Sequence, residues 1–173
     1  MLTIRTLSFT AAGLLALGLS ACATMSGDPL PTGDKETISY SVGPCFGFCP
    51  VYSVEVTSSG HLTYSGERHT AELGAKTRDA GGDAYNRVSR ALAAYRPAAG
   101  TTVHTDCDQR VSDLQTYTIT WTAPDGAKTT LIHDKGCRSP KNDVLNKVME
   151  GLPTQLGIEA WTKQTTRPGV SRG

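Results

Sequence analysis

The sequence VYSVEVTSSGHLTYS, residues 51–65, alternates apolar and polar side chains on both sides of a short polar break. Val54 and Val56 stand two positions apart before the break, and Leu62 and Tyr64 do so after it. A period of two places these side chains on one face of a strand. The Ser-Ser-Gly break supplies turn residues. The segment therefore predicts a β-hairpin with one apolar face.

A second segment of the same kind begins at Thr116–Thr122, where Tyr117, Ile119 and Trp121 alternate with threonines. A Pro-Asp-Gly turn follows, and the chain returns through Lys128–His133. These residues predict a second hairpin. Two further strands are predicted, at Thr37–Val42 and at Arg68–Leu73.

Two other segments have the apolar spacing of amphipathic helices. The first helix is predicted to begin with Asp83 as its N-cap and to end before Pro97. The second is predicted to begin at Ser139 or Pro140 and to end near Gly151 and Pro153. Their predicted apolar faces comprise Tyr85, Val88, Leu92 and Tyr95 in the first helix, and Val144, Leu145, Val148, Met149 and Leu152 in the second.

The order of these elements, a hairpin and then a helix, occurs twice. It predicts an α+β fold in which an antiparallel sheet from the two hairpins is covered on its apolar face by two helices. The repetition also suggests a ββα pseudo-repeat. We expect a single domain at 37–162.

The N-terminal residues have the pattern of an export signal. Arg5 is the only charge before Cys22, and the apolar run between them is too short to span a bilayer. The sequence Leu19-Ser-Ala-Cys22 resembles the bacterial lipobox, which implies cleavage after residue 21 and diacylation of Cys22. We therefore expect a signal peptide at 1–21, a lipidated cysteine and flexible tether at 22–36, and a disordered tail at 163–173.

This interpretation predicts a location in the cell envelope. The acyl chains would anchor the protein to a membrane, because two or more chains bind effectively permanently. Ala23, rather than an aspartate, follows Cys22. We therefore expect the outer membrane, facing the periplasm, in a cell that has two membranes.

Charge argues against nucleic acid as a partner. Removal of residues 1–21 leaves 16 basic and 16 acidic residues, so the mature chain has no formal net charge. Proteins that bind nucleic acid usually carry a basic excess or stripe. The sequence shows neither.

Four cysteines remain besides Cys22, namely Cys45, Cys49, Cys107 and Cys137. An even number in an exported chain predicts two disulfides, and three pairings are open. We favour Cys45 with Cys49 and Cys107 with Cys137. Closing the longer loop is worth about 3.7 kcal/mol in the chain-entropy model and closing the shorter one about 2.1 kcal/mol. The second pair is thus the expected structural brace.

The densest motif is GPCFGFCPVY, residues 43–52. It resembles the G-P-C-F-G-x-C-P-x-Y signature of an uncharacterised family of small bacterial domains, often secreted or lipid-anchored. The resemblance extends through Tyr64-Ser-Gly66 and, more weakly, to Trp161, and it implies shape rather than an activity. Phe46 and Phe48 flank Gly47 and are candidate partner-binding residues if the loop is an exposed tip; burial of both rings in the core is the alternative.

Three motifs suggest other chemistry. Cys45-x-x-x-Cys49 is similar to the Cu(I) motif of Sco-type assembly proteins, but there it opens a helix, whereas a strand is predicted here. His104, Cys107, His133 and Cys137 have spacings that a zinc site could use, with Asp106 and Asp108 nearby. Gly136-Cys-Arg138 faintly resembles the nucleophile segment of L,D-transpeptidases, without the histidine base. The carboxylates in this region, including Asp113, are spread along the sequence, which is more typical of residues that cap turns than of a paired catalytic acid and base.

The sequence therefore favours a non-enzymatic, disulfide-braced lipoprotein module that binds a protein or a cell-wall component. We expect no catalytic residue, no metal site and no cofactor. The alternative is a copper-binding or thiol-redox protein that uses Cys45 and Cys49.

Overall fold

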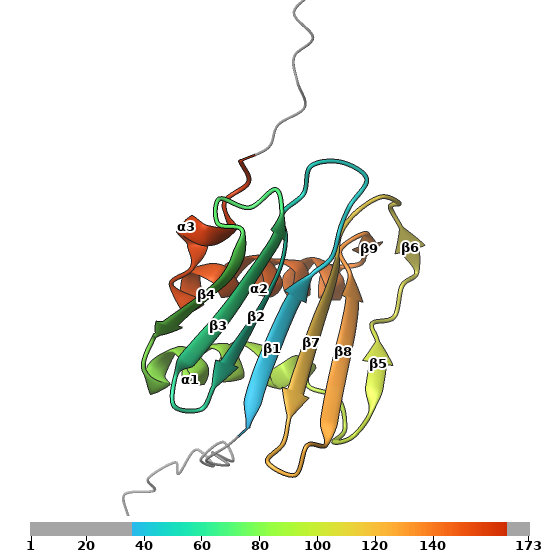
Figure 1. The fold of residues 1–173 in the computed structure, drawn as a ribbon. Helices are drawn as coiled ribbons and strands as arrows, with labels where there is room; N and C mark the ends of the chain where they lie inside the picture. Colours follow the sequence, from blue (N-terminus) through green and yellow to red (C-terminus); the bar gives the residue numbers. More distant parts are fainter. Residues whose placement is uncertain (1–35, 166–173) are drawn as a thin grey trace, which may run out of the picture. The chain divides into compact units, whose positions relative to one another are not determined.

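A computed structural model describes residues 36–165, and it contains both predicted hairpins and both predicted helices together with strands that were not predicted (Figure 1). The fold is of the α+β class predicted from the sequence. In chain order the elements are β1 (Thr37–Val42), β2 (Val51–Thr57), β3 (His61–Arg68), β4 (Gly74–Asp79), α1 (Gly82–Leu92), a 3-10 turn (Ala93–Tyr95), β5 (Thr102–His104), β6 (Gln109–Arg110), β7 (Thr116–Thr122), β8 (Lys128–Asp134), β9 (Cys137–Arg138), α2 (Pro140–Leu156) and α3 (Glu159–Thr162).

The main sheet has the strand order β4-β3-β2-β1-β7-β8-β5. The two predicted hairpins are β2-β3 and β7-β8, and β1 pairs antiparallel with both of them. β5 is an edge strand and runs parallel to β8, whereas all other neighbours are antiparallel. β6 and β9 form a separate two-stranded pair. β1 thus joins the hairpins into one sheet.

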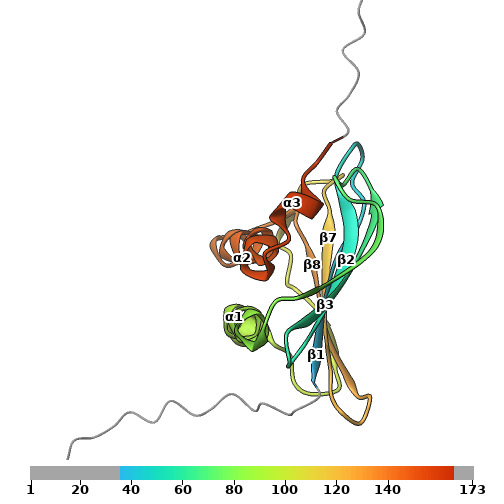
Figure 2. The same ribbon diagram turned by 60° about the vertical axis from the view of Figure 1, so that its left-hand side comes forward.

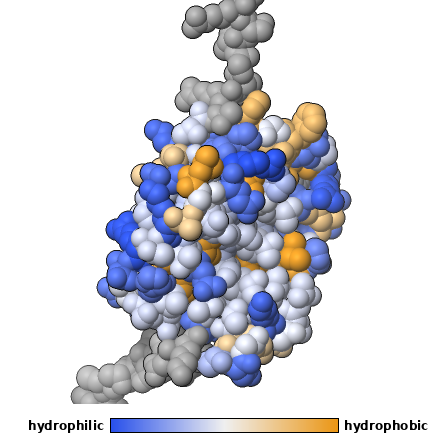
Figure 3. All heavy atoms as spheres, viewed as in Figure 1, coloured by the Kyte–Doolittle hydropathy of each residue, from blue (hydrophilic) through white to orange (hydrophobic). Residues whose placement is uncertain are grey.

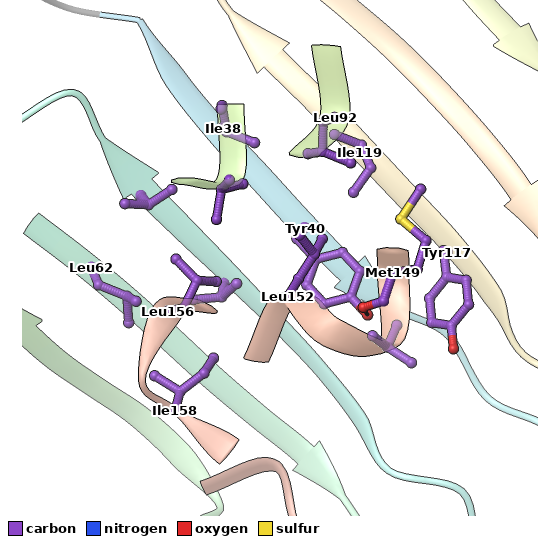
Figure 4. Close-up of a cluster of buried hydrophobic side chains, with 14 of the residues drawn as sticks. Ile38, Tyr40, Leu62, Leu92, Tyr117, Ile119, Met149, Leu152, Leu156 and Ile158 are labelled. Atoms are coloured by element: carbon purple, nitrogen blue, oxygen red, sulfur yellow. Dashed lines mark hydrogen bonds between the residues drawn. The ribbon is translucent and has the colours of Figure 1, made fainter. Parts of the chain in front are cut away.

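One face of the sheet is apolar because each of its five central strands buries alternate side chains. Tyr64, Val54, Tyr40, Ile119 and Leu131 form one row across these strands. Figure 2 shows α1 and α2 on this side of the sheet, and Figure 4 shows the cluster where side chains from the sheet and the helices meet. The prediction of a sheet covered by two helices is confirmed.

The opposite face carries hydroxyl groups instead. Figure 3 shows that its middle is pale, of intermediate hydropathy, with the most hydrophilic side chains toward the margins. The alternate positions on this face hold mainly Ser and Thr, including Ser39, Ser41, Ser53, Thr63, Ser65, Thr118, Thr120 and Thr130. The sheet is therefore one-sided, as its alternation requires.

The predicted strand at Arg68–Leu73 is wrong. β3 continues to Arg68, a turn follows, and β4 begins only at Gly74. This turn folds back over Gly66, where an added Cβ would lie 2.0 Å from the Glu72 carbonyl oxygen. β4 itself buries no side chain, so it lacks the apolar period by which strands are recognised.

The predicted end of the second helix is also wrong, because α2 continues past Gly151 and Pro153 to Leu156. A left-handed Gly157, with φ of 69°, caps it. Its buried face differs from the prediction too. Val144 is 54% exposed, whereas Asn142 and Asn146 are buried. The beginning is as predicted, with Ser139 as the N-cap and Pro140 in the first turn.

The first helix begins slightly earlier than predicted. Gly81 is its N-cap residue, and Asp83, the predicted cap, lies in the first turn. There a carboxylate still interacts favourably with the helix dipole.

Residues just outside the predicted range 37–162 make contacts with the domain at both ends. Glu36, assigned to the tether, is buried and forms an ion pair with Arg96 at 2.5 Å. Thr165, assigned to the tail, donates from its main-chain N–H to the His69 carbonyl at 3.2 Å. The predicted signal peptide at 1–21, Cys22, the tether through residue 35 and the tail residues 166–173 lie outside the described residues. No helix within 36–165 is long and apolar enough to cross a membrane.

Candidate functional site

The loop that joins β1 to β2 holds four of the candidate residues together. Cys45 and Cys49 form a disulfide within it. Gln115 closes the base of the loop, because its side-chain amide donates to the carbonyls of Gly43 and Pro50, at 3.2 and 2.7 Å. The loop is therefore fixed at its base and constrained at its end.

Phe46 and Phe48 lie on this loop and are exposed, with 88% and 39% of their surface accessible. The main-chain N–H of Phe46 donates to the Asp113 carbonyl at 3.1 Å. The Phe48 ring packs edge-on against His69, with centroids 5.3 Å apart. The loops at 43–50, 69–73 and 111–115 thus lie at one end of the sheet, seen at the top of Figure 1.

Exposed apolar side chains concentrate at this end. Phe46, Phe48, Leu73, Val111 and Leu114 all come from the three loops, and we call them the apolar tip. Among the described residues only Val103 and Val144 are further large apolar side chains with comparable exposure. A concentration of exposed apolar side chains is typical of a contact site for another molecule.

The tip loops also adopt uncommon backbone conformations. The non-glycine residues with positive φ in the described chain are His69, at 61°, and Asp113, at 68°. Such conformations cost about 1 kcal/mol or more each and persist only where the surroundings enforce them. The tip is thus built by packing and hydrogen bonds rather than by local preference.

The second disulfide joins Cys107 to Cys137, so the structure has the pairing that we favoured. Cys137 is buried, and its sulfur is bonded rather than presented as a nucleophile. This arrangement does not support the transpeptidase-like interpretation of Cys137.

The structure does not assemble the four ligands of the zinc alternative. His104 is exposed on β5, whereas His133 is buried and bonded to other groups. Within residues 36–165 no group of three or more His, Cys, Asp or Glu side chains is arranged to hold a metal ion.

His133 instead belongs to a buried hydrogen-bond network. Its Nδ1 lies 2.8 Å from Thr105 Oγ1 and its Nε2 lies 3.0 Å from Asn146 Oδ1. Because an amide oxygen can only accept, Nε2 carries a proton and Nδ1 accepts from the Thr105 hydroxyl. Burial lowers the pKa of His133, so the ring is neutral. The network joins β8 to α2 and to the end of β5.

Within residues 36–165, a larger and a smaller cavity open on the helical side of the sheet. The larger, about 700 Å³, lies between β5, the segment 94–101 and the first turns of α2, and we call it the β5 groove. The smaller, about 280 Å³, is lined by Tyr40, Tyr52 and Tyr117 and by the ion pair of Lys135 and Glu150, at 2.7 Å. Burial raises the pKa of all three tyrosines, so they stay protonated.

Comparison with known families matches residues 36–153 to a domain of unknown function, DUF6438. This range covers more than half of the chain. The chain belongs to the DUF6438 family. A search of curated proteins found no match.

The matched range of the DUF6438 domain contains the motif at 43–52, both disulfides, the apolar tip and the β5 groove. The family description supplies no activity.

The sequence of the DUF6438 domain predicts the loop with Phe46 and Phe48, but it does not predict the rest of the apolar tip or the β5 groove. Val111 and Leu114 lie in a segment with no apolar period. The groove residues come from three separate parts of the chain and share no motif. The only sequence signal for this part of the tip was indirect, namely that Val111 and Leu114 are isolated apolar residues in a connection rich in Gly and Asp.

Proposed function

We propose that this DUF6438 protein is an envelope lipoprotein, anchored through Cys22, whose domain is a non-enzymatic binding module that contacts a protein or cell-wall partner through the apolar tip. The observation that carries the proposal is the concentration of Phe46, Phe48, Leu73, Val111 and Leu114 at one end of the sheet.

The position of the tip relative to β1 supports this function. β1 begins at Thr37, where the chain from Cys22 joins the domain, and ends at Val42, directly before the loop that carries Phe46. Six residues of strand span about 20 Å. A domain tethered at Thr37 can therefore present the tip away from the membrane that holds its acyl chains.

The lipid anchor has a direct test. We expect the full chain, produced in a bacterial host fed labelled palmitate, to incorporate the label and to fractionate with the outer membrane. The substitution Cys22→Ser should abolish the label. Equal labelling of both chains would refute lipidation at this residue.

Partner binding can be tested by cross-linking in cells. A photo-reactive residue placed at Val111 should give one defined adduct, and Phe46→Ser in the same chain should remove most of it. Val144→Ser is the matched control, because Val144 is exposed but lies on α2. If the adduct survives Phe46→Ser or is lost equally with Val144→Ser, the tip is not the contact surface.

The alternative, copper or thiol-redox chemistry at Cys45 and Cys49, has one supporting observation. His69 lies beside the loop, since its ring contacts Phe48, although in the oxidised loop the described residues do not gather it with both sulfurs as a metal site. Two thiolates and an imidazole are suitable ligands for Cu(I). After reduction, stoichiometric Cu(I) binding that is lost with His69→Gln would favour this function over the binding module.

A further inference from the structure

The β5 groove has the size and lining of a site for a small ligand. Its volume of about 700 Å³ lies within the range of about 300–1,000 Å³ that is usual for such sites. Leu131 and Leu145, both buried, and the half-exposed Val103 form its apolar part. None of these residues belongs to the apolar tip.

The walls of the groove are fixed by hydrogen bonds. The Gly100 N–H donates to Thr129 Oγ1 at 2.9 Å, and the Asn142 side chain donates to the Asp106 carbonyl at 2.9 Å. The disulfide of Cys107 with Cys137 follows directly after Asp106. The groove is therefore preformed rather than a gap between mobile segments.

The groove lies beside a free sheet edge, because Val103 and His104 of the edge strand β5 line it. β5 is the last strand in the sheet order and pairs only with β8. The Thr101 carbonyl and the Thr105 N–H bond to β8. In a parallel ladder alternate residues face the neighbouring strand, so the main-chain groups of Thr102 and His104 face outward. An extended peptide can pair with such an edge.

Charged residues of both signs line the same groove. Lys141 on α2 makes no ion pair with any residue in 36–165, and neither do Asp106 and Asp108. Arg96, by contrast, is paired with Glu36. An unpaired cation and two unpaired carboxylates complement a ligand that carries both an ammonium group and a carboxylate.

From these observations we infer that the β5 groove binds a short peptide with free termini and an aliphatic side chain. The peptide main chain pairs with Thr102 and His104, its side chain occupies the apolar part, and its charged ends meet Lys141 and the pair Asp106 and Asp108. The site is independent of the apolar tip and of the lipid anchor.

The test uses the full chain, ¹⁵N-labelled in a mild detergent and titrated with alanyl-valyl-alanine. Amide shifts should concentrate in residues 94–106 and 139–145. Blocking both peptide termini should weaken binding about tenfold, because charge-assisted hydrogen bonds are lost. Shifts at the tip loops, equal binding of the blocked peptide, or no binding at millimolar concentration would overturn the inference.

Two variants test whether Lys141 and Asp106 bind the charged ends of the peptide. Lys141→Ala and Asp106→Asn should each weaken binding about tenfold, whereas Lys147→Ala, an exposed lysine on the same helix outside the groove, should not. Phe46→Ser should leave peptide binding unchanged, which separates this site from the proposed tip function. Equal effects of Lys141→Ala and Lys147→Ala on peptide binding would contradict the proposal, and so would a dimer in light scattering whose amide shifts place β5 at the interface.

Discussion

His133 shows how a single buried side chain couples this domain to pH. The imidazole is fully buried, stacks on Tyr117 and bonds to Thr105 and Asn146. Burial lowers its pKa in the folded state. In the unfolded chain the pKa returns to about 6.5. The unfolded state therefore takes up the proton first as the pH falls.

We expect this difference to appear in stability. The contribution of His133 is fully present above about pH 6.5 and is lost as the pH falls from there through the lowered folded-state pKa. His133→Gln removes the titration and should flatten the fall in melting temperature between neutral and mildly acidic pH. The exposed His104→Gln is the control and should keep the wild-type slope. Identical slopes for wild type and His133→Gln would show that another group is responsible.

At the scale of the element, α2 depends on a hydroxyl from the sheet. Pro153 has no N–H, so it leaves the Met149 carbonyl, four residues earlier, without its helical partner. The Tyr40 hydroxyl donates to this carbonyl at 3.0 Å and takes the place of the missing bond. The helix can therefore continue through the proline to Gly157.

Removal of the Tyr40 hydroxyl should destabilise the folded domain. Tyr40→Phe leaves the buried Met149 carbonyl unpaired and should lower the free energy of unfolding by about 1–3 kcal/mol, measured by urea denaturation. Tyr95→Phe is the matched control, because Tyr95 packs against the core but its hydroxyl has no hydrogen bond to any residue in 36–165. A loss no larger than in the control would mean that water satisfies the carbonyl instead.

The elements also show what a sequence can predict here. Alternate side chains are buried in five strands, namely β1, β2, β3, β7 and β8. Their apolar residues therefore recur with a period of two, and the sequence alone predicts these strands. β4 and β5 bury none, so no apolar period marks them. β4 and β5 are held in the sheet by main-chain hydrogen bonds to a neighbouring strand. Such bonds do not require a particular pattern of apolar and polar residues in the sequence.

The end of α2 and the β5 groove were missed for a related reason. Pro153 stops a helix in isolation, and the compensating Tyr40 lies far away in the sequence. The loop with Cys45 and Cys49 was found because its cysteines, glycines and aromatic residues are close together. The β5 groove was not found because tertiary packing alone brings Lys141 and Asp106 to the lining of one cavity.

At the scale of the whole molecule, the two disulfides constrain different parts of the chain. Cys45 and Cys49 close a short loop that carries the tip. Cys107 and Cys137 are separated by 30 positions, and they tie the connection after β5 to β9, directly before α2. The second bond spans the β7-β8 hairpin and so restricts the unfolded chain far more.

We therefore expect unequal losses when each pair is replaced by serine. Cys107→Ser with Cys137→Ser should lower the free energy of unfolding by about 3.7 kcal/mol, and Cys45→Ser with Cys49→Ser by about 2.1 kcal/mol, in non-reducing urea denaturation. Reduction of the wild type should give at least the larger loss. The Cys45 and Cys49 variant should keep the wild-type shape of the groove, seen as unchanged amide shifts at residues 94–106. A larger loss for the short loop would mean that the tip, rather than the hairpin, is the main brace of the domain.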